Sequence, residues 1–462
     1  MSENASTFKA KSTIKSADLD HRFKVNFNIS KYNNAVPQGK LQFPDTGLAR
    51  ERAKNIKWRA LETLDQQLED FEANFTRRGG KVIWANDDKQ ALAAVLEICK
   101  AKNCRSVVKS KSMVTEEIHL NKFLTDNNIE SVETDLGEYI QQLDGEPPYH
   151  IVTPAMHKSK EDVAKLFYEK LGTPPNLNPQ QLTLVAREKL RTKYPVAEIG
   201  VTGANFIIAD TGSIAVTENE GNARLSAAFP KTHIVIAGIE KIIPSLTDLA
   251  LFWPLLSTYG TGQKVTVYNT IFSGPRQPGE SDGPEEMYVI LLDNGRTNIL
   301  DNPVSRESLY CIRCGACLNA CPVYKNIGGH AYGSTYSGPI GAVITPRLSG
   351  LKDWKHLSNA SSLCGNCTEV CAVKINLHEL LLENRYEAAD KGLTSTGEKL
   401  AWKLWRKASL NRGMMNRGNK KIKNWLVNKA FSGWTAHRAE LDFSEKTFNQ
   451  LWKEKFSPAE KK

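Results

Sequence analysis

Cysteines are the residues of this chain whose spacing most directly indicates chemistry. Seven of the nine cysteines lie between residues 311 and 371, in two tight groups. The first group is Cys311, Cys314, Cys317 and Cys321, followed at once by Pro322, and the second is Cys364, Cys367 and Cys371. A C-x2-C-x2-C-x3-C-P run holds [4Fe-4S] clusters in bacterial ferredoxins. The sequence therefore predicts two iron-sulfur clusters, which would transfer single electrons.

The ligands of the two clusters are expected to cross between the groups. Three closely spaced cysteines can surround one face of a cubane, and in two-cluster ferredoxins the cysteine before proline binds the other cluster. The first cluster would then have four thiolates, from Cys311, Cys314, Cys317 and Cys371. The second cluster would have three, from Cys321, Cys364 and Cys367.

One ligand of the second cluster is therefore missing. When the two groups are aligned on their last cysteines, Ser361 stands where a cysteine is expected, and Ala372 replaces the proline. A [4Fe-4S] cluster could take Ser361, Ser362, His356 or solvent as its fourth ligand, and the alternative is a [3Fe-4S] cluster. The [4Fe-4S] form is favoured, because its labile corner iron is easily lost on isolation, and that loss would leave a [3Fe-4S] cluster.

Zinc and disulfides are the alternative interpretations of these cysteines. The first residues, MSENASTFKAK, lack the apolar stretch of a secretory signal, and disulfides are rare in reducing compartments. Zinc sites usually consist of two ligand pairs, whereas this run has four cysteines and a proline. Iron-sulfur clusters are therefore preferred, in a soluble protein that we expect in the cytoplasm.

The composition indicates a globular protein with one strongly basic segment. At 462 residues the chain should contain two or three domains. The net charge is +10, and residues 399–438 contain eleven Lys or Arg and no Asp or Glu, interleaved with tryptophans. This segment could lie on an acidic membrane surface, dock an acidic partner subunit or bind nucleic acid, or its aromatic residues could pack on the protein's own core. Nucleic acid is the least favoured, because no recognised binding motif accompanies the charge.

The order of expected elements predicts an α/β domain before the cysteines. Residues 1–47 read as a polar, extended N-terminal arm, and a helix is expected over 48–78. Strands are expected at 81–85, 106–109, 130–133, 150–153, 204–209, 213–217, 233–237, 264–272 and 287–292, and helices at 89–102, 115–127, 161–171 and 179–193. This alternation predicts a mainly parallel sheet covered by helices. The expected domains are the arm, an α/β domain at 48–298, a helical ferredoxin-like two-cluster domain at 299–390 and a basic helical tail at 391–462.

Two groups of loops in the α/β domain could form a ligand pocket. One is residues 109–112 (KSKS), between a strand and a helix, and the other runs through 202–205, 210–213 and 220–222. Ligands of α/β sheets usually bind at strand ends. Tight turns explain the same residues equally well. No G-x-G-x-x-G, P-loop or G-x-S-x-G motif accompanies them, so no nucleotide or flavin is expected by a standard motif.

Several segments resemble one known family. They are 110–112, 133–138, 203–206, 210–213 and 219–222 in the α/β domain, and 327–333 (IGGHAYG) and 338–342 (GPIGA) between the cysteine groups. In their order they are similar to the lactate-utilisation protein B family, whose α/β part is the lactate-utilisation (LUD) domain. The family's second motif commonly has proline at the position of Ala372.

The resemblance implies an iron-sulfur electron-transfer subunit of a multi-protein system that oxidises L-lactate to pyruvate. It implies a sheet like that of CoA transferases and sugar-phosphate isomerases, ligation by the seven cysteines, and two partners, a cysteine-rich subunit and a second LUD-domain protein. Two other hypotheses stay open. The α/β domain could itself bind or oxidise a 2-hydroxy acid, with Glu133, Asp135 or Glu220 as acid or base, or the chain could be an iron-sulfur redox sensor.

Overall fold

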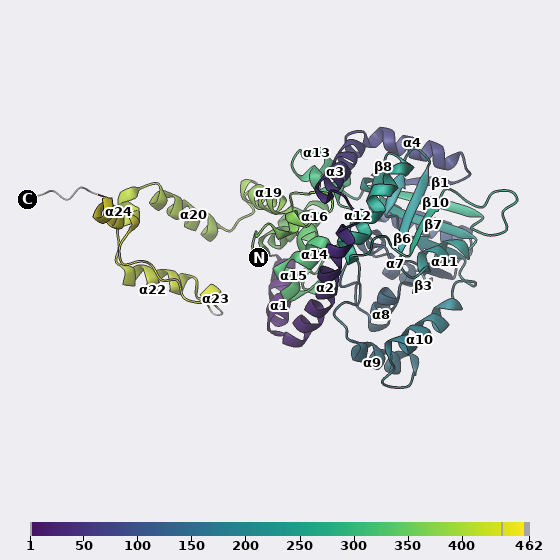
Figure 1. The fold of residues 1–462 in the computed structure, drawn as a ribbon, viewed down its shortest axis with the longest axis horizontal. Coiled ribbons are helices and arrows are strands. Elements are labelled where there is room, and N and C mark those ends of the chain that lie inside the picture. Colours follow the sequence, from purple (N-terminus) through teal and green to yellow (C-terminus); the bar gives the residue numbers. More distant parts are fainter. Residues whose placement is uncertain (1, 436–437, 457–462) are drawn as a thin grey trace, which may run out of the picture. The chain divides into compact units, whose positions relative to one another are not determined.

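The computed structural model describes residues 2–435 and 438–456, which form two compact units, Met1–Ala388 and Ala389–Lys462 (Figure 1). Each unit is described by itself. The predicted domain boundaries within the first unit stay predictions.

A six-stranded parallel sheet forms the centre of the first unit. Its order is β1 (Lys81–Ala85), β10 (Glu286–Leu292), β7 (Thr232–Gly238), β4 (Ile199–Thr202), β2 (Ser106–Lys109) and β3 (Glu130–Glu133). All of its strand pairs are parallel, as the alternating pattern predicted. The last strand of the sheet, β10, returns to lie between β1 and β7.

The middle of this sheet is buried on both faces, which explains its continuous apolar sequence. In β7, Ile234 and Ile236 pack into one core cluster, and the alternate residues Val235 and Ala237 pack into another. The core cluster of Val235 and Ala237 also includes residues of a smaller mixed sheet. Its strands are β8 (Ile242–Ile243), β5 (Phe206–Ile208), β6 (Ser213–Glu218) and β9 (Tyr268–Phe272).

Helices precede, connect and follow these strands. They are α3 (Thr46–Glu62), α4 (Leu64–Thr76), α5 (Asp88–Ala101), α6 (Met113–Glu117), α7 (Leu120–Asp126), α8 (Leu136–Asp144), α9 (Lys160–Leu171), α10 (Pro179–Arg191), α11 (Asn222–Ala228), α12 (Leu249–Thr261) and α13 (Arg296–Asp301). Short 3-10 turns η1 (Ile239–Lys241) and η2 (Leu246–Asp248) flank β8.

The cysteine region is helical, as expected. It consists of η3 (Ser305–Tyr310), α14 (Ala316–Ala320), α15 (Pro322–Ile327), η4 (His330–Tyr332), α16 (Gly338–Leu348), α17 (Leu351–Asn359), α18 (Asn366–Glu369) and α19 (Leu377–Asp390). Its buried residues join those of the α/β part in one core cluster, so the two parts pack against each other.

The prediction of an extended N-terminal arm is wrong, because this segment forms α1 (Glu3–Ala17) and α2 (Leu19–Lys40). Side chains of Ser2 and Asp18 cap the two helices by accepting hydrogen bonds from backbone N–H groups. Figure 1 shows both helices beside the iron-sulfur region, where α1 contacts α15 and α17 and α2 contacts α12. Few of their residues are buried, Val25 and Ile29 among them, so the apolar periodicity is weak.

Three other expected elements differ from the structure. The single helix expected over 48–78 breaks at Thr63, and the one over 115–127 breaks at His119, whose φ is 53°. Residues 150–153 form a turn instead of a strand, because Nδ1 of His150 accepts hydrogen bonds from the backbone N–H groups of Val152 and Thr153. The central strand β4 was not predicted.

The second unit consists of short helices joined by loops. They are α20 (Thr396–Ser409), α21 (Arg412–Asn416), α22 (Lys420–Ala430), α23 (Ser432–Thr435) and α24 (Phe448–Phe456). Trp402, Trp405 and Trp425 are 61%, 62% and 60% exposed, so these side chains do not pack into a core of their own.

Candidate iron-sulfur site and adjoining cavity

Cysteines from both predicted motifs meet in one small, mainly apolar cavity. It is lined by Cys311, Cys314, Cys317 and Cys371 together with Ile340, Ile375 and Leu377. The loop from residue 311 curves around it, with Arg313 and Gly315 at φ angles of 60° and 81°. The structure thus brings together the four cysteines assigned to the first cluster, including the one from the second motif.

The environment of these sulfurs suits a metal cluster. Backbone N–H groups of Arg313 and Ile375 donate to Sγ of Cys311 and Cys371 over 3.4 and 3.3 Å. Such bonds stabilise negative charge on cluster sulfurs. Burial raises the pKa of Cys314 and of Cys371 to about 12, so both thiols are protonated at neutral pH until a metal displaces the protons. Four free thiols around one cavity are a donor set that fits a [4Fe-4S] cluster.

The other three cysteines form a second, more exposed group. Burial raises the pKa of Cys367 to about 11, and the nearby thiol of Cys321 adds to the rise, which places these residues close together. Cys364 is exposed, and its pKa is lowered by a hydrogen bond from the backbone of Asn366 and by the Ser362 side chain. The structure therefore also gathers the three cysteines assigned to the second cluster. Their role as ligands stays a prediction.

The candidates for the missing fourth ligand differ in their surroundings. Ser362 lies within hydrogen-bonding reach of Cys364, whereas the Ser361 hydroxyl accepts a hydrogen bond from the N–H of Leu363. The His356 ring packs between Phe8 and Trp354. Within residues 2–435 and 438–456, no interaction joins His356 to the three cysteines, and both of its ring nitrogens are buried without a hydrogen-bond partner.

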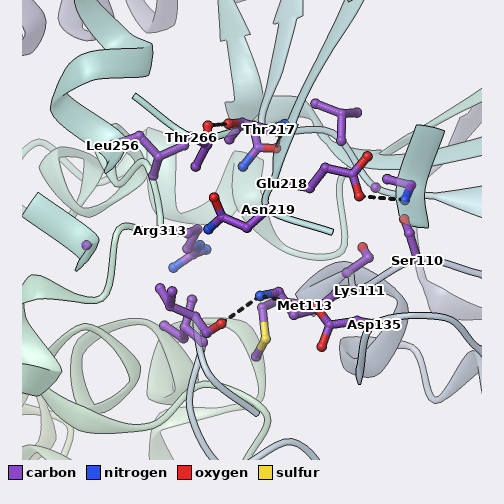
Figure 2. Close-up of a pocket in the computed structure, with 18 of the residues that line it drawn as sticks. Ser110, Lys111, Met113, Asp135, Thr217, Glu218, Asn219, Leu256, Thr266 and Arg313 are labelled. Carbon is purple, nitrogen blue, oxygen red and sulfur yellow. Dashed lines mark hydrogen bonds and ion pairs between the residues drawn. The ribbon is translucent and has the colours of Figure 1, made fainter. Parts of the chain in front are cut away.

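A larger cavity of about 240 Å³ lies between the α/β part and the first cysteine loop (Figure 2). The residues predicted for a ligand pocket that line it are Ser110, Lys111, Ser112, Asp135, Gly203, Ala204, Asn205, Glu220 and Asn222. The lining residues that were not predicted for the pocket include Glu218, Asn219 and Lys241, and Arg313 and Cys314 of the first motif. The cavity therefore adjoins a predicted cluster ligand.

Two predicted pocket features lie elsewhere. Lys109 and Glu133 form a buried ion pair of 2.8 Å, joined by Glu116 and Glu138, so Glu133 is not a cavity acid or base. The turn at 210–213 packs on α4, where a Cβ on Gly212 would lie 2.3 Å from the backbone nitrogen of Phe75. That close approach, and a φ of 57°, explain the glycine without a ligand.

The acidic residues of the cavity are already hydrogen-bonded to the backbone. Glu218 accepts from the N–H groups of Ala223 and Arg224, and Glu220 accepts from that of Leu136. Burial and the charge of Asp135 raise the pKa of Glu220 to about 7. Of the three acids suggested from the sequence, Asp135 and Glu220 therefore do face the cavity.

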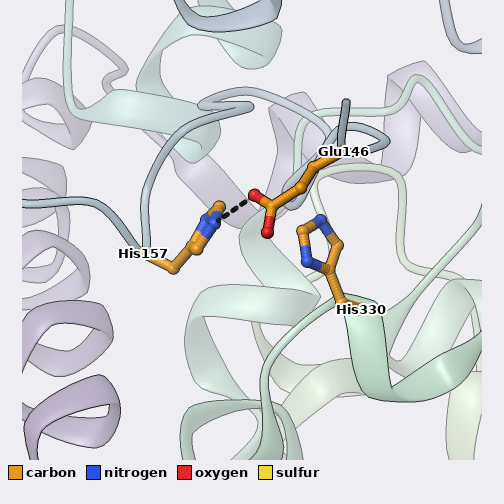
Figure 3. Close-up of side chains that lie close together, drawn as sticks. All are labelled: Glu146, His157 and His330. Carbon is orange, nitrogen blue, oxygen red and sulfur yellow. Dashed lines mark hydrogen bonds and ion pairs between the residues drawn. The ribbon is translucent and has the colours of Figure 1, made fainter. Parts of the chain in front are cut away.

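A second side-chain cluster joins the α/β part to the iron-sulfur region. Ligand atoms of Glu146, His157 and His330 lie within 4.8 Å of one another (Figure 3). His157 Nε2 lies 3.1 Å from Glu146 Oε2, Lys158 Nζ lies 3.0 Å from the same oxygen, and His330 Nε2 lies 2.7 Å from the Pro147 carbonyl. Because Lys158 already neutralises Glu146, we interpret this cluster as a structural contact that holds the 327–333 segment against the α/β part.

Comparisons with known proteins agree with both parts. Residues 68–292 match the LUD domain, and residues 307–375 match the 4Fe-4S dicluster domain. A relative named "Lactate utilization protein B", from Bacillus licheniformis, is 48% identical over 358 residues, which are 77% of this chain and 75% of the relative. A relative named "Uncharacterized electron transport protein YkgF", from Escherichia coli (strain K12), is 42% identical over 424 residues, 89% of each chain.

A solved structure of a DUF162 family protein from Deinococcus radiodurans aligns with 14% identity and a TM-score of 0.29, covering 50% of this chain and 98% of that one, a likeness too weak to carry an argument. Among the described residues of this chain, no helix is both long and apolar enough to cross a bilayer.

Proposed function

The chain belongs to the lactate utilization protein B family, and we propose that it is the iron-sulfur electron-transfer subunit of a multi-protein system oxidising L-lactate to pyruvate. The observation that carries this proposal is the meeting of Cys311, Cys314, Cys317 and Cys371 at one cavity. A disulfide or a zinc finger does not require this crossover between motifs, whereas a two-cluster electron carrier does.

We assign the first cluster to these four cysteines and the second to Cys321, Cys364 and Cys367, both as [4Fe-4S], with the fourth ligand of the second cluster open. When bound, each cluster would supply one-electron oxidation and reduction. The protein's own contribution is to hold the thiolates, to donate backbone N–H groups to their sulfurs and to exclude water from the first group.

The test is anaerobic purification of the full chain from a cytoplasmic expression host, followed by iron and sulfide counting and EPR of the reduced protein. About eight iron and eight sulfide per chain are expected for two cubanes, with seven iron if the second has lost a corner. Zinc in the folded protein, or a folded protein that takes up no iron, would contradict the proposal.

We further propose that electrons leave for partner subunits, a cysteine-rich protein and a second LUD-domain protein. The exposed Cys364 supports transfer at the surface, because electron transfer between proteins requires close approach of the two redox centres. Reconstitution with these partners should give lactate-dependent reduction of a dye that the chain alone does not give.

The basic tail is the candidate docking element for a membrane surface or an acidic subunit. Its tryptophans are exposed and lie among lysines and arginines, the composition of helices that bind anionic surfaces. Removal of residues 391–462 should abolish cosedimentation with phosphatidylglycerol vesicles if the surface is lipid. If the partner is a subunit, removal should instead abolish only complex formation.

A further inference from the structure

Two buried cations at one end of the larger cavity are only partly paired, because Arg313 and Lys241 share the one carboxylate of Glu240 with Arg296. Lys241 is 6% exposed, and Nη1 of Arg313 is buried without a hydrogen-bond partner. Within the described part of the chain, no acceptor binds Nζ of Lys241. Both residues line the cavity beside Cys314. Buried charge that is only partly offset is costly, so this arrangement points to a ligand of opposite charge.

The protein's own carboxylates supply only part of that charge. The nearest acid, Glu240, is held by the guanidinium of Arg296 at 2.5 Å and lies 3.6 Å from Arg313. Glu218 and Glu220 accept backbone hydrogen bonds instead. Figure 2 shows Arg313 across the cavity from Ser110 and from Asp135, whose carboxylate lies 3.9 Å from the ammonium of Lys111.

The rest of the lining indicates the size and polarity of the ligand. A volume of about 240 Å³ is below the range of pockets for drug-sized molecules, so it suits a small metabolite. Met113, Val216 and Leu256 offer an apolar wall, and Asn219 offers an amide that can contact a hydroxyl or a carbonyl group.

We propose that this cavity binds a small 2-hydroxy or 2-oxo acid, with its carboxylate at Arg313 and Lys241, beside the first cysteine group. The anion site follows from the geometry alone, whereas the choice of acid rests on the proposed function. Bound there, the acid lies next to a cluster ligand, so its presence can influence the first cluster directly.

The competing explanation is that the two cations only offset the negative charge of the thiolates in the first group. Binding measurements separate the two explanations. If a cation serves only the cluster, replacing it should change the midpoint potential of the cluster without changing the affinity for any acid.

The experiment is isothermal titration calorimetry on the anaerobically purified full chain, with iron, sulfide and EPR measured on the same sample. The titrants are sodium L-lactate, sodium pyruvate, neutral lactamide and sodium phosphate. Saturable binding of lactate or pyruvate is expected, with at least tenfold weaker binding of lactamide, which lacks the charge, and of phosphate. Lys241→Gln and Arg313→Gln should each weaken binding of the acid at least tenfold.

Lys231→Gln is the matched control, because Lys231 has an 80% exposed side chain outside the cavity, and this variant should bind like the unaltered chain. If Arg313→Gln loses its cluster, Lys241→Gln alone decides the test. No saturable acid binding by a chain with intact clusters, unchanged affinity in Lys241→Gln, or a shift in potential without loss of affinity would each overturn the site. Acid binding by a chain without clusters would contradict the electron-transfer function but leave the site standing.

Discussion

The two cysteine groups differ in how completely the protein covers them. The first group lines a cavity between the α/β part and the iron-sulfur helices, and none of its four cysteines is exposed. The second group includes the exposed Cys364 and lacks a fourth cysteine. This difference fits a division of work in the proposed function, in which the first cluster would adjoin the larger cavity and the second would pass electrons to the partner protein.

Removal of one cysteine from each group should have the largest effect, and it should affect stability differently in the two groups. Cys317→Ser should lose the first cluster and also destabilise the fold, because Cys317 lies in the core among Ile340 and Leu318. Cys364→Ser, at the surface, should lose iron only from the second cluster and keep the native fold. Iron counting, EPR and thermal unfolding of both variants provide the measurement. Equal loss of stability in the two variants would contradict the difference in enclosure.

Completion of the second group should make the two clusters alike. In Ser361→Cys, a thiol replaces the hydroxyl at the position where the first motif has a cysteine. We expect the second cluster to resist oxidation, with several-fold slower loss of iron to ferricyanide and EDTA and no [3Fe-4S] EPR signal. Ser358→Cys is the control, because Ser358 is buried in α17 and its hydroxyl donates to the Ala342 carbonyl. Iron loss that remains as fast as in the unaltered chain would rule out Ser361 as the ligand position.

The enclosure of the first group depends on a close approach of α12. A Cβ on Gly260 would lie 2.9 Å from the carbonyl oxygen of Cys314, and neither backbone can move freely. Gly260→Ala should therefore cost about 1–2 kcal/mol, because the overpacking outweighs the gain in helix propensity. Gly397→Ala, in α20 with no neighbour within 4 Å, should be neutral or slightly stabilising. Urea denaturation of both variants tests this, and equal stabilities would show that α12 does not hold the cysteine loop.

The sequence predicted elements whose signals are local. The strand predicted at Lys81–Ala85 follows from a short run of apolar residues and occurs as expected, and the side chain of Asp87 caps the helix after it. The strand predicted at 150–153 is wrong. Its β-branched side chains are typical of a strand, but the ring of His150 accepts hydrogen bonds from two backbone N–H groups and stabilises a turn. Weak apolar periodicity hid α1 and α2, whose few buried residues contact distant helices.

The candidate site shows the same limit. Cysteine spacing alone predicted that Cys371 joins the first motif, because in two-cluster ferredoxins the last cysteine of each motif binds the other cluster. Arg313 and Lys241 could not be grouped in this way, since 71 positions separate them and only packing of η1 against the cysteine loop brings them to one cavity. The place of Arg313 inside the cysteine run, directly before Cys314, was the one signal in the sequence that could have directed attention to it.

The smallest expected effect is on the pH dependence of stability, and it comes from a buried histidine beside the first group. Burial lowers the pKa of His150 to about 3, and its ring lies against Gly315 of the cysteine loop. The unfolded chain takes up a proton as pH falls below about 6.5, whereas the folded chain does not until about 3, so stability falls over this interval. His150 should account for about 1.4 kcal/mol of the stability lost between pH 7.5 and 5.5.

His150→Gln should remove this part of the pH dependence, measured by urea denaturation at the two pH values. His233→Gln is the matched control, because burial also lowers the pKa of His233 to about 3, but within the parallel sheet. Both variants should therefore lose the same pH slope, and only His150→Gln should change the EPR spectrum of the first cluster. An unchanged spectrum would mean that His150 supports the turn at 150–153 without shaping the cysteine loop, and that the enclosure of the first group depends on α12 alone.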